Sequence, residues 1–300
     1  TMPIPVIFDT DIGSDIDDTW ALAQILKTPE LDVKLIATDR DDTVYRTKLI
    51  CKYLEAVNCT HIPVGMGCVQ EHVYTKPRQA SWVEDYDLDA YSGTLHKDGV
   101  DAIIQTIMDA PEPLTLICVG PMPNIGEALD REPAIAERTH FVGMHGCVYK
   151  SVRGEGVFPE ANVVNDIAAS KKVFTAPWKS MIITPQDSCS FVKLTGDQYQ
   201  AIRQSNDPAL KALMDNYNIW AKGTTHDPNV ASSVLFDTVA VYLAYTTKHL
   251  VMKNMGIRIT DEGVTAPAPD AQHMDVALDW TDLDAFHQYL TERLLSPIVQ

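Results

Sequence analysis

Short apolar runs alternate with segments of helical periodicity through most of the chain. Apolar runs bounded by turn residues are typical of buried strands, whereas apolar positions every three or four residues indicate helices. The pattern predicts strands at Val6–Phe8, Val33–Thr38, Leu114–Val119, Phe141–Met144 and Met181–Thr184. Between them it predicts helices at Thr19–Lys27, Thr43–Val57, Val100–Asp109, Asn124–Leu129 and Asp166–Phe174. This alternation predicts an α/β fold with a mostly parallel central β-sheet flanked by helices.

The pattern becomes mainly helical after Thr195, so the C-terminal third is expected to differ from the rest. Helices are predicted at Asp197–Gln204, Pro208–Lys222, Ser232–Thr247 and Asp282–Leu295. A small edge hairpin, Gly256–Thr260 with Met274–Ala277, is expected between the last two. Neither a composition break nor an internal repeat divides the sequence, and we therefore expect a single domain over residues 1–300.

Composition narrows the class of protein further. Hydrophobic residues make up 45% of the 300 residues, which is enough for a full core, and the net charge is -17. That charge argues against nucleic acid or an anionic membrane as the main partner. The sequence contains neither a membrane-spanning apolar stretch nor a basic-plus-apolar signal segment at its start. Six scattered cysteines without a C-x-x-C pair indicate reduced thiols, so we expect a cytoplasmic protein.

Five aspartates stand between the first predicted strand and helix: Asp9, Asp11, Asp15, Asp17 and Asp18. Carboxylates this close repel one another unless a cation or protons compensate, and oxygen ligands favour Ca²⁺ or Mg²⁺. A simpler interpretation is available for Asp17, which could cap the helix, but it does not explain Asp11. An EF-hand loop fits poorly, because its glycine at position six and its glutamate at position twelve are absent.

This turn resembles the D-x-D-x-G-x-D-D-A-x-A-L signature of the inosine-uridine-preferring nucleoside hydrolases, with two more residues between the glycine and the paired aspartates. Three further segments resemble that family in the same order along the chain. They are Leu116–Ile125, which resembles a strand followed by G-x-L-T-N; Glu160–Ala169, which resembles E-F-N-x-x-x-D-P-E-A-A; and Leu235–Val241, which resembles H-D-x-x-A-V-A. The resemblance spans residues 6 to about 250. It implies a single nucleoside-hydrolase-like domain with a Rossmann-like core.

The resemblance also implies a ligand set for a calcium ion. Its members would be the carboxylates of Asp11, Asp18 and Asp237 and the main-chain carbonyl of Pro123. By the same analogy, a second set of side chains would contact the ribose or the attacking water. That set consists of Asp17, Asp42, Glu160 and Asn162.

The activity implied is calcium-dependent hydrolysis of the N-glycosidic bond of ribonucleosides to free base and ribose. Cleavage of such a bond passes through an oxocarbenium-like sugar. A metal-bound water would attack the anomeric carbon with Asp11 as general base. The expected partner is a small-molecule nucleoside, and the expected assembly is a homodimer or homotetramer.

Several positions depart from the family pattern. Phe236 stands where the classical enzymes carry a histidine that helps the base leave, and His226 is the substitute candidate. Trp82 and Trp220 are available to stack on a base. Arg40 is unusual, because it could pair with the neighbouring acids or reach a ligand.

Other functions stay open at this point. The chain could be a divergent relative that binds a ribose-like ligand with little turnover, or it could hydrolyse a non-standard riboside. A metal-dependent phosphohydrolase of another α/β fold would need a lysine and a threonine or serine at strand ends, and the sequence offers no convincing pair. The identity of the leaving base cannot be predicted from these residues.

Overall fold

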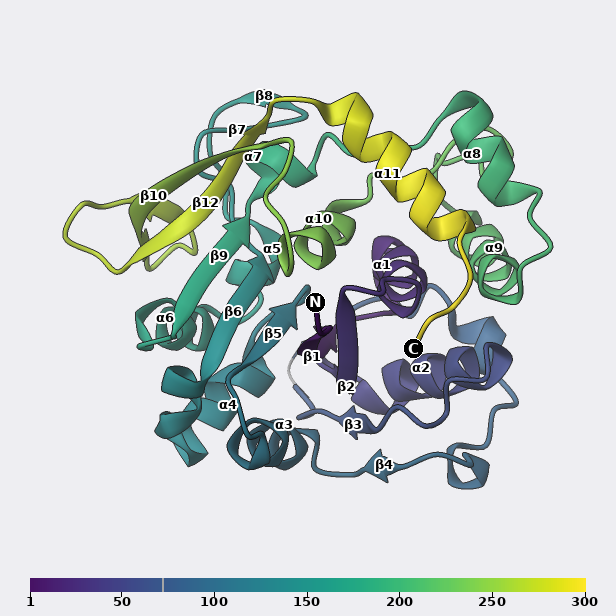
Figure 1. Ribbon diagram of the computed structural model, residues 1–300, viewed down its shortest axis with the longest axis horizontal. Helices are drawn as coiled ribbons and strands as arrows, with labels where there is room; N and C mark the ends of the chain where they lie inside the picture. The colour runs from purple at the N-terminus through teal and green to yellow at the C-terminus, as the bar shows by residue number, and fades with distance from the viewer. Residues whose placement is uncertain (72) are drawn as a thin grey trace.

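A ten-stranded, mostly parallel sheet forms the centre of the computed structural model, which describes residues 1–71 and 73–300. Its strands are β1 (Ile4–Thr10), β2 (Leu31–Thr38), β3 (Val64–Met66), β4 (Leu95–His96), β5 (Leu114–Cys118), β6 (Thr139–Met144), β9 (Ser180–Thr184), β10 (Leu250–Ile259), β11 (Thr265–Pro267) and β12 (His273–Trp280). Their order across the sheet is β11-β10-β12-β9-β6-β5-β1-β2-β3-β4 (Figure 1). A separate hairpin pairs β7 (Lys150–Ser151) with β8 (Gly154–Glu155).

The register of the sheet places β1 at a central position, paired in parallel with both β2 and β5. Parallel strands end at the same edge, so the segments that follow β1, β2 and β5 come together there. The strands of the last quarter differ, since β10 pairs antiparallel with both β11 and β12.

Helices follow most strands and lie on both faces of the sheet. The α-helices are α1 (Asp17–Leu26), α2 (Thr43–Ala56), α3 (Gly99–Asp109), α4 (Pro123–Arg131), α5 (Ala161–Val164), α6 (Ile167–Thr175), α7 (Gln186–Cys189), α8 (Gly196–Arg203), α9 (Pro208–Ala221), α10 (Phe236–Leu243) and α11 (Leu283–Leu295). The 3-10 helices are η1 (Ala80–Val83), η2 (Leu88–Ala90) and η3 (Pro133–Arg138).

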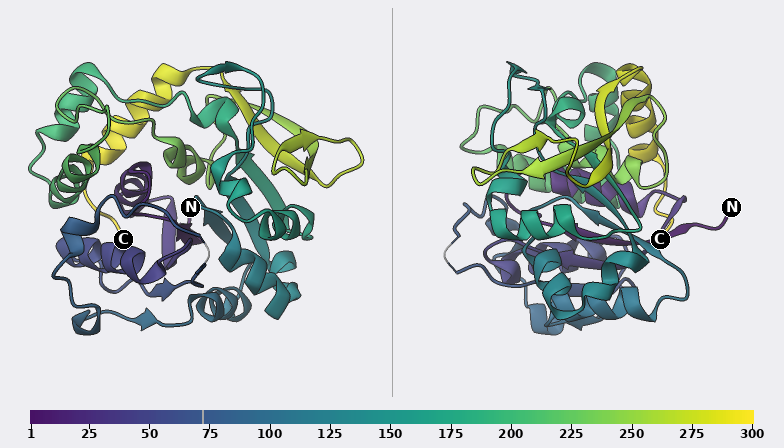
Figure 2. Two further views of the ribbon diagram at one scale, coloured as in Figure 1. Left: turned by 180° about the vertical axis from the view of Figure 1, so that it is seen from behind. Right: turned by 90° about the vertical axis from the view of Figure 1, so that its left-hand side faces the viewer.

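Alternate side chains of β1 enter two separate cores. Val6 and Phe8 pack with α1, α2 and α8 to α11, whereas Ile7 packs on the other face with α3, α4 and α6. Figures 1 and 2 show the resulting layers, with the sheet between two groups of helices. A continuous apolar run such as Val6–Phe8 is what a strand buried on both faces requires.

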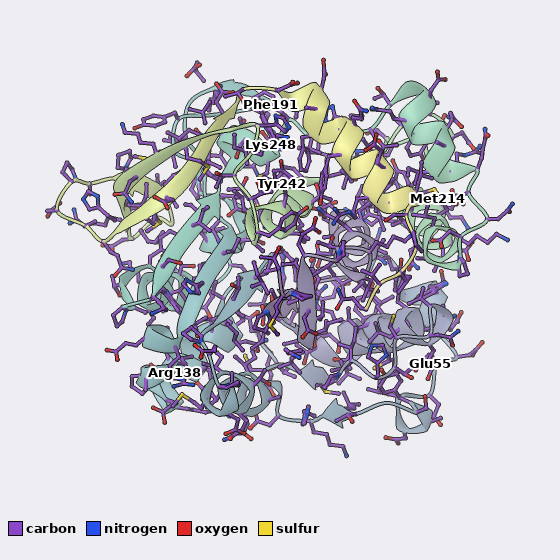
Figure 3. The ribbon with its side chains drawn as sticks, viewed as in Figure 1. Glu55, Arg138, Phe191, Met214, Tyr242 and Lys248 are labelled. Atoms are coloured by element: carbon purple, nitrogen blue, oxygen red, sulfur yellow. The ribbon has the colours of Figure 1, made fainter. Side chains whose placement is uncertain are left out.

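Helix α1 lies within the larger core, and all ten of its residues are buried. Trp20 packs near Tyr199 of α8 and Tyr217 of α9, with ring centroids 6.3 and 6.1 Å away. In the same core, Tyr242 of α10, which is labelled in Figure 3, meets Phe286 of α11 edge-on with ring centroids 5.0 Å apart. The contacts of Trp20 hold the first helix against helices that follow it by nearly two hundred residues.

The predicted fold class is confirmed, with two differences in the C-terminal third. Helix α10 begins at Phe236 rather than Ser232, because the preceding segment bonds to another loop: Ser232 donates to the Leu194 carbonyl and Leu235 to the Val192 carbonyl. The predicted hairpin is larger than expected and extends the central sheet through β12 and β9. Within the described residues no helix is both long and apolar enough to cross a membrane.

Candidate active site

The aspartate-rich turn joins the end of β1 to the start of α1 at the carboxyl edge of the sheet. Gly13 permits this turn because its φ is +109° and a Cβ there would lie 2.7 Å from Cε2 of Tyr45. The Tyr45 hydroxyl donates to the Gly13 carbonyl at 2.9 Å, which holds the turn against α2. A side chain at this position would therefore be strained and would also collide with its neighbour.

Three carboxylates meet where α1 packs against α10. Oxygens of Asp17, Asp18 and Asp237 lie within 4.8 Å of one another, and each residue is at most 3% exposed. The Asp237 amide donates to Oδ2 of Asp17 at 3.0 Å, and the Thr10 hydroxyl donates to Oδ2 of Asp18 at 2.6 Å. Such a set of hard oxygen donors fits a divalent cation such as Ca²⁺.

Burial and mutual repulsion both act on this cluster. Burial raises the pKa of Asp17 well above its usual value, and the nearby Asp15 charge raises it further. Burial likewise raises the pKa values of Asp18 and Asp237, as do the surrounding carboxylates. A cation at this position would favour the ionised carboxylates and offset the free-energy cost of burying their charges close together.

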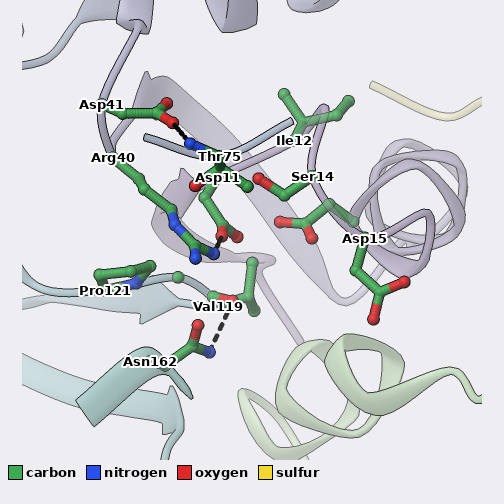
Figure 4. A network of polar contacts seen from close by, with 12 residues as sticks. Asp11, Ile12, Ser14, Asp15, Arg40, Asp41, Thr75, Val119, Pro121 and Asn162 are labelled. Carbon is green, nitrogen blue, oxygen red and sulfur yellow. Dashed lines mark hydrogen bonds and ion pairs between the residues drawn. The ribbon is translucent and has the colours of Figure 1, made fainter. Parts of the chain in front are cut away.

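Asp11 lines the same cleft from the turn, but its nearest charged partner is Arg40. Nη1 of Arg40 donates to Oδ2 of Asp11 at 3.0 Å (Figure 4). The cluster therefore contains Asp17 in addition to the predicted Asp18 and Asp237, while Asp11 stands beside it. All four carboxylates face one cavity of about 120 Å³.

Glu160 and Asn162 form the opposite wall of the cleft, at the start of α5. Amides of Gly146 and Asn162 donate to the Glu160 carboxylate, each at 2.8 Å. Burial raises the pKa of Glu160 to about 7, although these two amides lower it. Nδ2 of Asn162 donates to the carbonyls of Val119 and Met144 at 3.1 and 3.0 Å, so its amide oxygen is free to accept a bond from a ligand (Figure 4).

Comparison with known proteins decides the family. The sequence profile of the inosine-uridine preferring nucleoside hydrolases matches residues 6–288. The chain belongs to this family. A non-specific ribonucleoside hydrolase of Salmonella paratyphi B is 32% identical over 185 residues, which cover 58% of each chain. A uridine nucleosidase of Arabidopsis thaliana is 21% identical over 97% of this chain and 93% of its own length.

Solved structures of nucleoside hydrolases share the fold. A purine-preferring ribonucleoside hydrolase from Gardnerella vaginalis superposes with a TM-score of 0.82 and 21% identity, covering 97% of this chain and 98% of that one. A plant nucleoside hydrolase gives the same TM-score and identity, covering 98% of this chain and all of the other. The matched region spans less than two thirds of the Salmonella relative's own length.

A second acidic group lies directly behind the nucleoside-hydrolase turn. Asp9 is fully buried and accepts a bond from Nδ2 of Asn124 at 2.9 Å. Burial raises the pKa of the neighbouring Asp39 well above its usual value, and the Asp9 charge raises it further. Asp9 therefore supports the turn from inside the core, as a residue without access to the cleft.

A second cavity of about 460 Å³ adjoins the cleft and shares Asp15 with it. Trp220 forms part of its wall and donates its indole N–H to the Ser14 carbonyl at 3.0 Å. The His226 ring lies 5.0 Å from the Trp220 ring, and Arg78 reaches the same cavity. Sequence reasoning named Trp220 and His226 but missed Arg78, whose position depends on the long loop before η1.

Three other predicted site residues do not line the cleft. Pro123 is the first residue of α4, and Val119, directly after β5, contributes to the wall instead. Asp42 is exposed and caps α2 by accepting a bond from the Tyr45 amide at 3.1 Å. Trp82 packs beneath Lys52 on α2, with Nζ 4.5 Å from its ring centroid. Pro123 and Asp42 lie away from the cleft because each stands at the start of a helix, α4 and α2 respectively, rather than at the end of a strand.

Proposed function

We propose that the protein hydrolyses the N-glycosidic bond of ribonucleosides in a calcium-dependent reaction. The observation that carries this proposal is one cleft with cation-binding and sugar-binding walls. Asp18 and Asp237 stand on the first wall, and Glu160 and Asn162 on the second. Membership of the nucleoside hydrolase family supports the same reaction.

The cation is expected to lie among the buried carboxylates of the α1–α10 contact. Asp18 and Asp237 belong both to the set implied by the sequence and to the geometric cluster, and we assign them as ligands together with Asp11, which stands beside that cluster in the same cleft. Val119 is our choice for the neutral ligand, because it lines the cleft where Pro123 does not, and its carbonyl, which accepts one bond from Asn162, keeps a second lone pair. When bound, calcium would orient sugar hydroxyls and make a coordinated water more acidic.

Asp11 acts as the general base in this proposal, taking the proton of the water that attacks the anomeric carbon. Its Oδ2 accepts the bond from Arg40, which holds the carboxylate in position. Glu160 and Asn162 bind ribose hydroxyls, and the surrounding negative charge favours an oxocarbenium-like sugar over its neutral ground state. Asp17, at the start of α1, is assigned the remaining hydroxyl of the sugar.

The departing base is assigned to the second cavity. Trp220 can stack on a planar base there, and His226 beside it can supply a proton. Phe236 lines the cleft and carries no proton to donate, so the acid must come from another element. His226 is the candidate closest to the Trp220 ring.

Release of free base from a panel of ribosides and 2′-deoxyribosides tests this proposal. We expect release from ribosides, strong loss of rate with the 2′-deoxy substrates, and loss of activity in a calcium chelator that added calcium restores. Activity that is unchanged by the chelator would overturn the calcium-dependent mechanism. We place the enzyme in the cytoplasm as a homodimer or homotetramer, which sedimentation analysis of the purified protein can test for assembly.

Binding of a ribose-like ligand with little turnover is a second candidate. Phe236 favours it, because a phenyl ring in the cleft replaces a proton donor. Under this alternative, ribose would bind with measurable heat while no base was released from any member of the panel.

A further inference from the structure

Arg40 brings a fixed positive charge into an otherwise acidic cleft. Among the described residues that line this cavity, it stands as the sole lysine or arginine beside six carboxylates: Asp11, Asp15, Asp17, Asp18, Glu160 and Asp237. Its guanidinium is 3.0 Å from Oδ2 of Asp11, and the two side chains are only 19% and 7% exposed. The ion pair is therefore shielded from solvent and is stronger than a surface pair.

The backbone that carries Arg40 is strained. Arg40 has a φ of 74° and Asp41 a φ of 40°, so two consecutive non-glycine residues adopt left-handed conformations. Each such residue costs on the order of 1 kcal/mol or more and persists only where its surroundings impose it. The loop is thus held in a conformation that its own residues disfavour.

Arg46 of α2 supplies the contacts that impose this conformation. Its Nε donates to the Arg40 carbonyl at 2.9 Å, and its Nη2 donates to the Asp41 carboxylate at 2.7 Å. Its Nη1 donates to the carbonyls of Asp11 and Ile12 at 2.6 and 2.9 Å. The fully buried Arg46 guanidinium therefore fixes the backbone at Arg40 and the backbone at Asp11. In this way it sets the distance between these two residues.

We propose that Arg40 is a built-in counter-ion of the cleft, which competes with the divalent cation for Asp11 and sets how tightly that cation binds. This inference rests on the cation site of the proposed function. A positive side chain held beside the ligands repels a second positive charge, and Asp11 cannot give both oxygens to the cation while Oδ2 is paired. Conversely, Arg40 partly neutralises the carboxylates when the cation is absent.

Calcium binding to the purified full chain, measured by calorimetry after removal of bound metal, tests this role. Arg40→Gln should bind calcium at least tenfold more tightly than the unmodified protein. Without calcium the same variant should unfold at a lower temperature, and saturating calcium should close that difference. Arg40→Gly is the second variant, because glycine removes the charge and also suits the positive φ.

Arg258→Gln is the matched control, since it removes one charge from an exposed ion pair with Asp270 at the sheet edge. Its calcium affinity should stay within twofold of the unmodified protein. Equal or weaker calcium affinity in both Arg40 variants would overturn the inference, as would absence of calcium binding in every variant. Release of base by the unmodified protein is measured separately. If that hydrolysis depends on calcium while the Arg40 variants bind calcium as the unmodified protein does, the counter-ion role of Arg40 is rejected and the proposed function is retained.

Discussion

Asp11 combines two properties that a general base needs, a fixed position and access to the cleft. Its carboxylate accepts the bond from Arg40 and lines the cavity. Replacing it by asparagine preserves its size and removes its capacity to accept a proton. We expect Asp11→Asn to lower kcat at least a hundredfold, the scale of a lost general base, while the protein stays folded in saturating calcium. Rates of base release under saturating calcium measure this effect.

A matched variant is provided by Asp15, which shares the turn and the cleft but is exposed. Asp15→Asn removes one nearby charge without removing the proposed base, so it should retain most of its rate. Near-normal turnover in Asp11→Asn would refute its role. Equal losses in both variants would point to the charge of the cleft rather than to proton transfer.

Glu160 makes stability depend on pH. Burial raises its pKa to about 7 from a usual 4.5, so the folded protein binds this proton more tightly than the unfolded chain does. The stabilisation is fully present below pH 4.5 and is lost as the pH rises through 7. At about 1.4 kcal/mol per pKa unit, the change is on the order of 3 kcal/mol.

Glu160→Gln should therefore reduce the pH dependence of stability in a metal chelator between pH 5 and 8, while the buried Asp17, Asp18 and Asp237 maintain the rest of it. Denaturant unfolding at several pH values gives the free energy of unfolding for both proteins. Glu262→Gln serves as control, because Glu262 is exposed and should leave the curve unchanged. A slope in Glu160→Gln that matched the unmodified protein would show that other groups cause the effect.

At the scale of elements, the β1–α1 turn depends on Gly13. Alanine at this position would have to adopt a φ of +109° and would place its Cβ 2.7 Å from the Tyr45 ring. Gly154→Ala is a close match, because its φ is +117° and nothing lies within 4 Å of its Cβ. We expect Gly13→Ala to lose about 1–3 kcal/mol more stability than Gly154→Ala, the cost of overpacking. Chemical denaturation compares the two, and equal losses would mean that the contact with Tyr45 relaxes freely.

Helix α10 contributes to the cleft through Asp237 at its first turn. Asp237→Ala should weaken calcium binding at least tenfold, because this 2% exposed carboxylate belongs to the buried cluster. Asp227→Ala should have little effect, since Asp227 is exposed and accepts bonds within its own loop from Asn229. A calcium titration of both variants decides the assignment, and identical affinities would contradict it.

For the whole molecule, the central strands were predictable because strands buried on both faces require continuous apolar runs. Four motifs in order also predicted that Asp11, Asp18, Glu160, Asn162 and Asp237 share a site, and these residues do line one cleft. The short strands β3 and β4 were missed, since three and two residues carry too little pattern.

The remaining site details depend on geometry that residue types do not encode. Whether the Val119 or the Pro123 carbonyl faces a ligand depends on where β5 ends and α4 begins. The reach of Arg40 depends on a left-handed backbone imposed by Arg46, a residue 35 positions beyond Asp11. Such long-range contacts override the local preferences on which sequence reasoning relies.

The first turns of α1 and α10 both carry aspartates of the buried cluster, but they lie far apart in the sequence. This separation affects when the cluster can form during protein synthesis. The Asp237 amide bonds to Asp17, 220 residues earlier, so one half of the carboxylate cluster is made long before the other. At roughly 5–20 residues per second, that interval is on the order of 10 to 45 s. During that time the emerging chain carries the acidic turn with Arg40 and Arg46 but without Asp237. A cation that needed both sides of this cluster would therefore bind only after α10 had packed against α1.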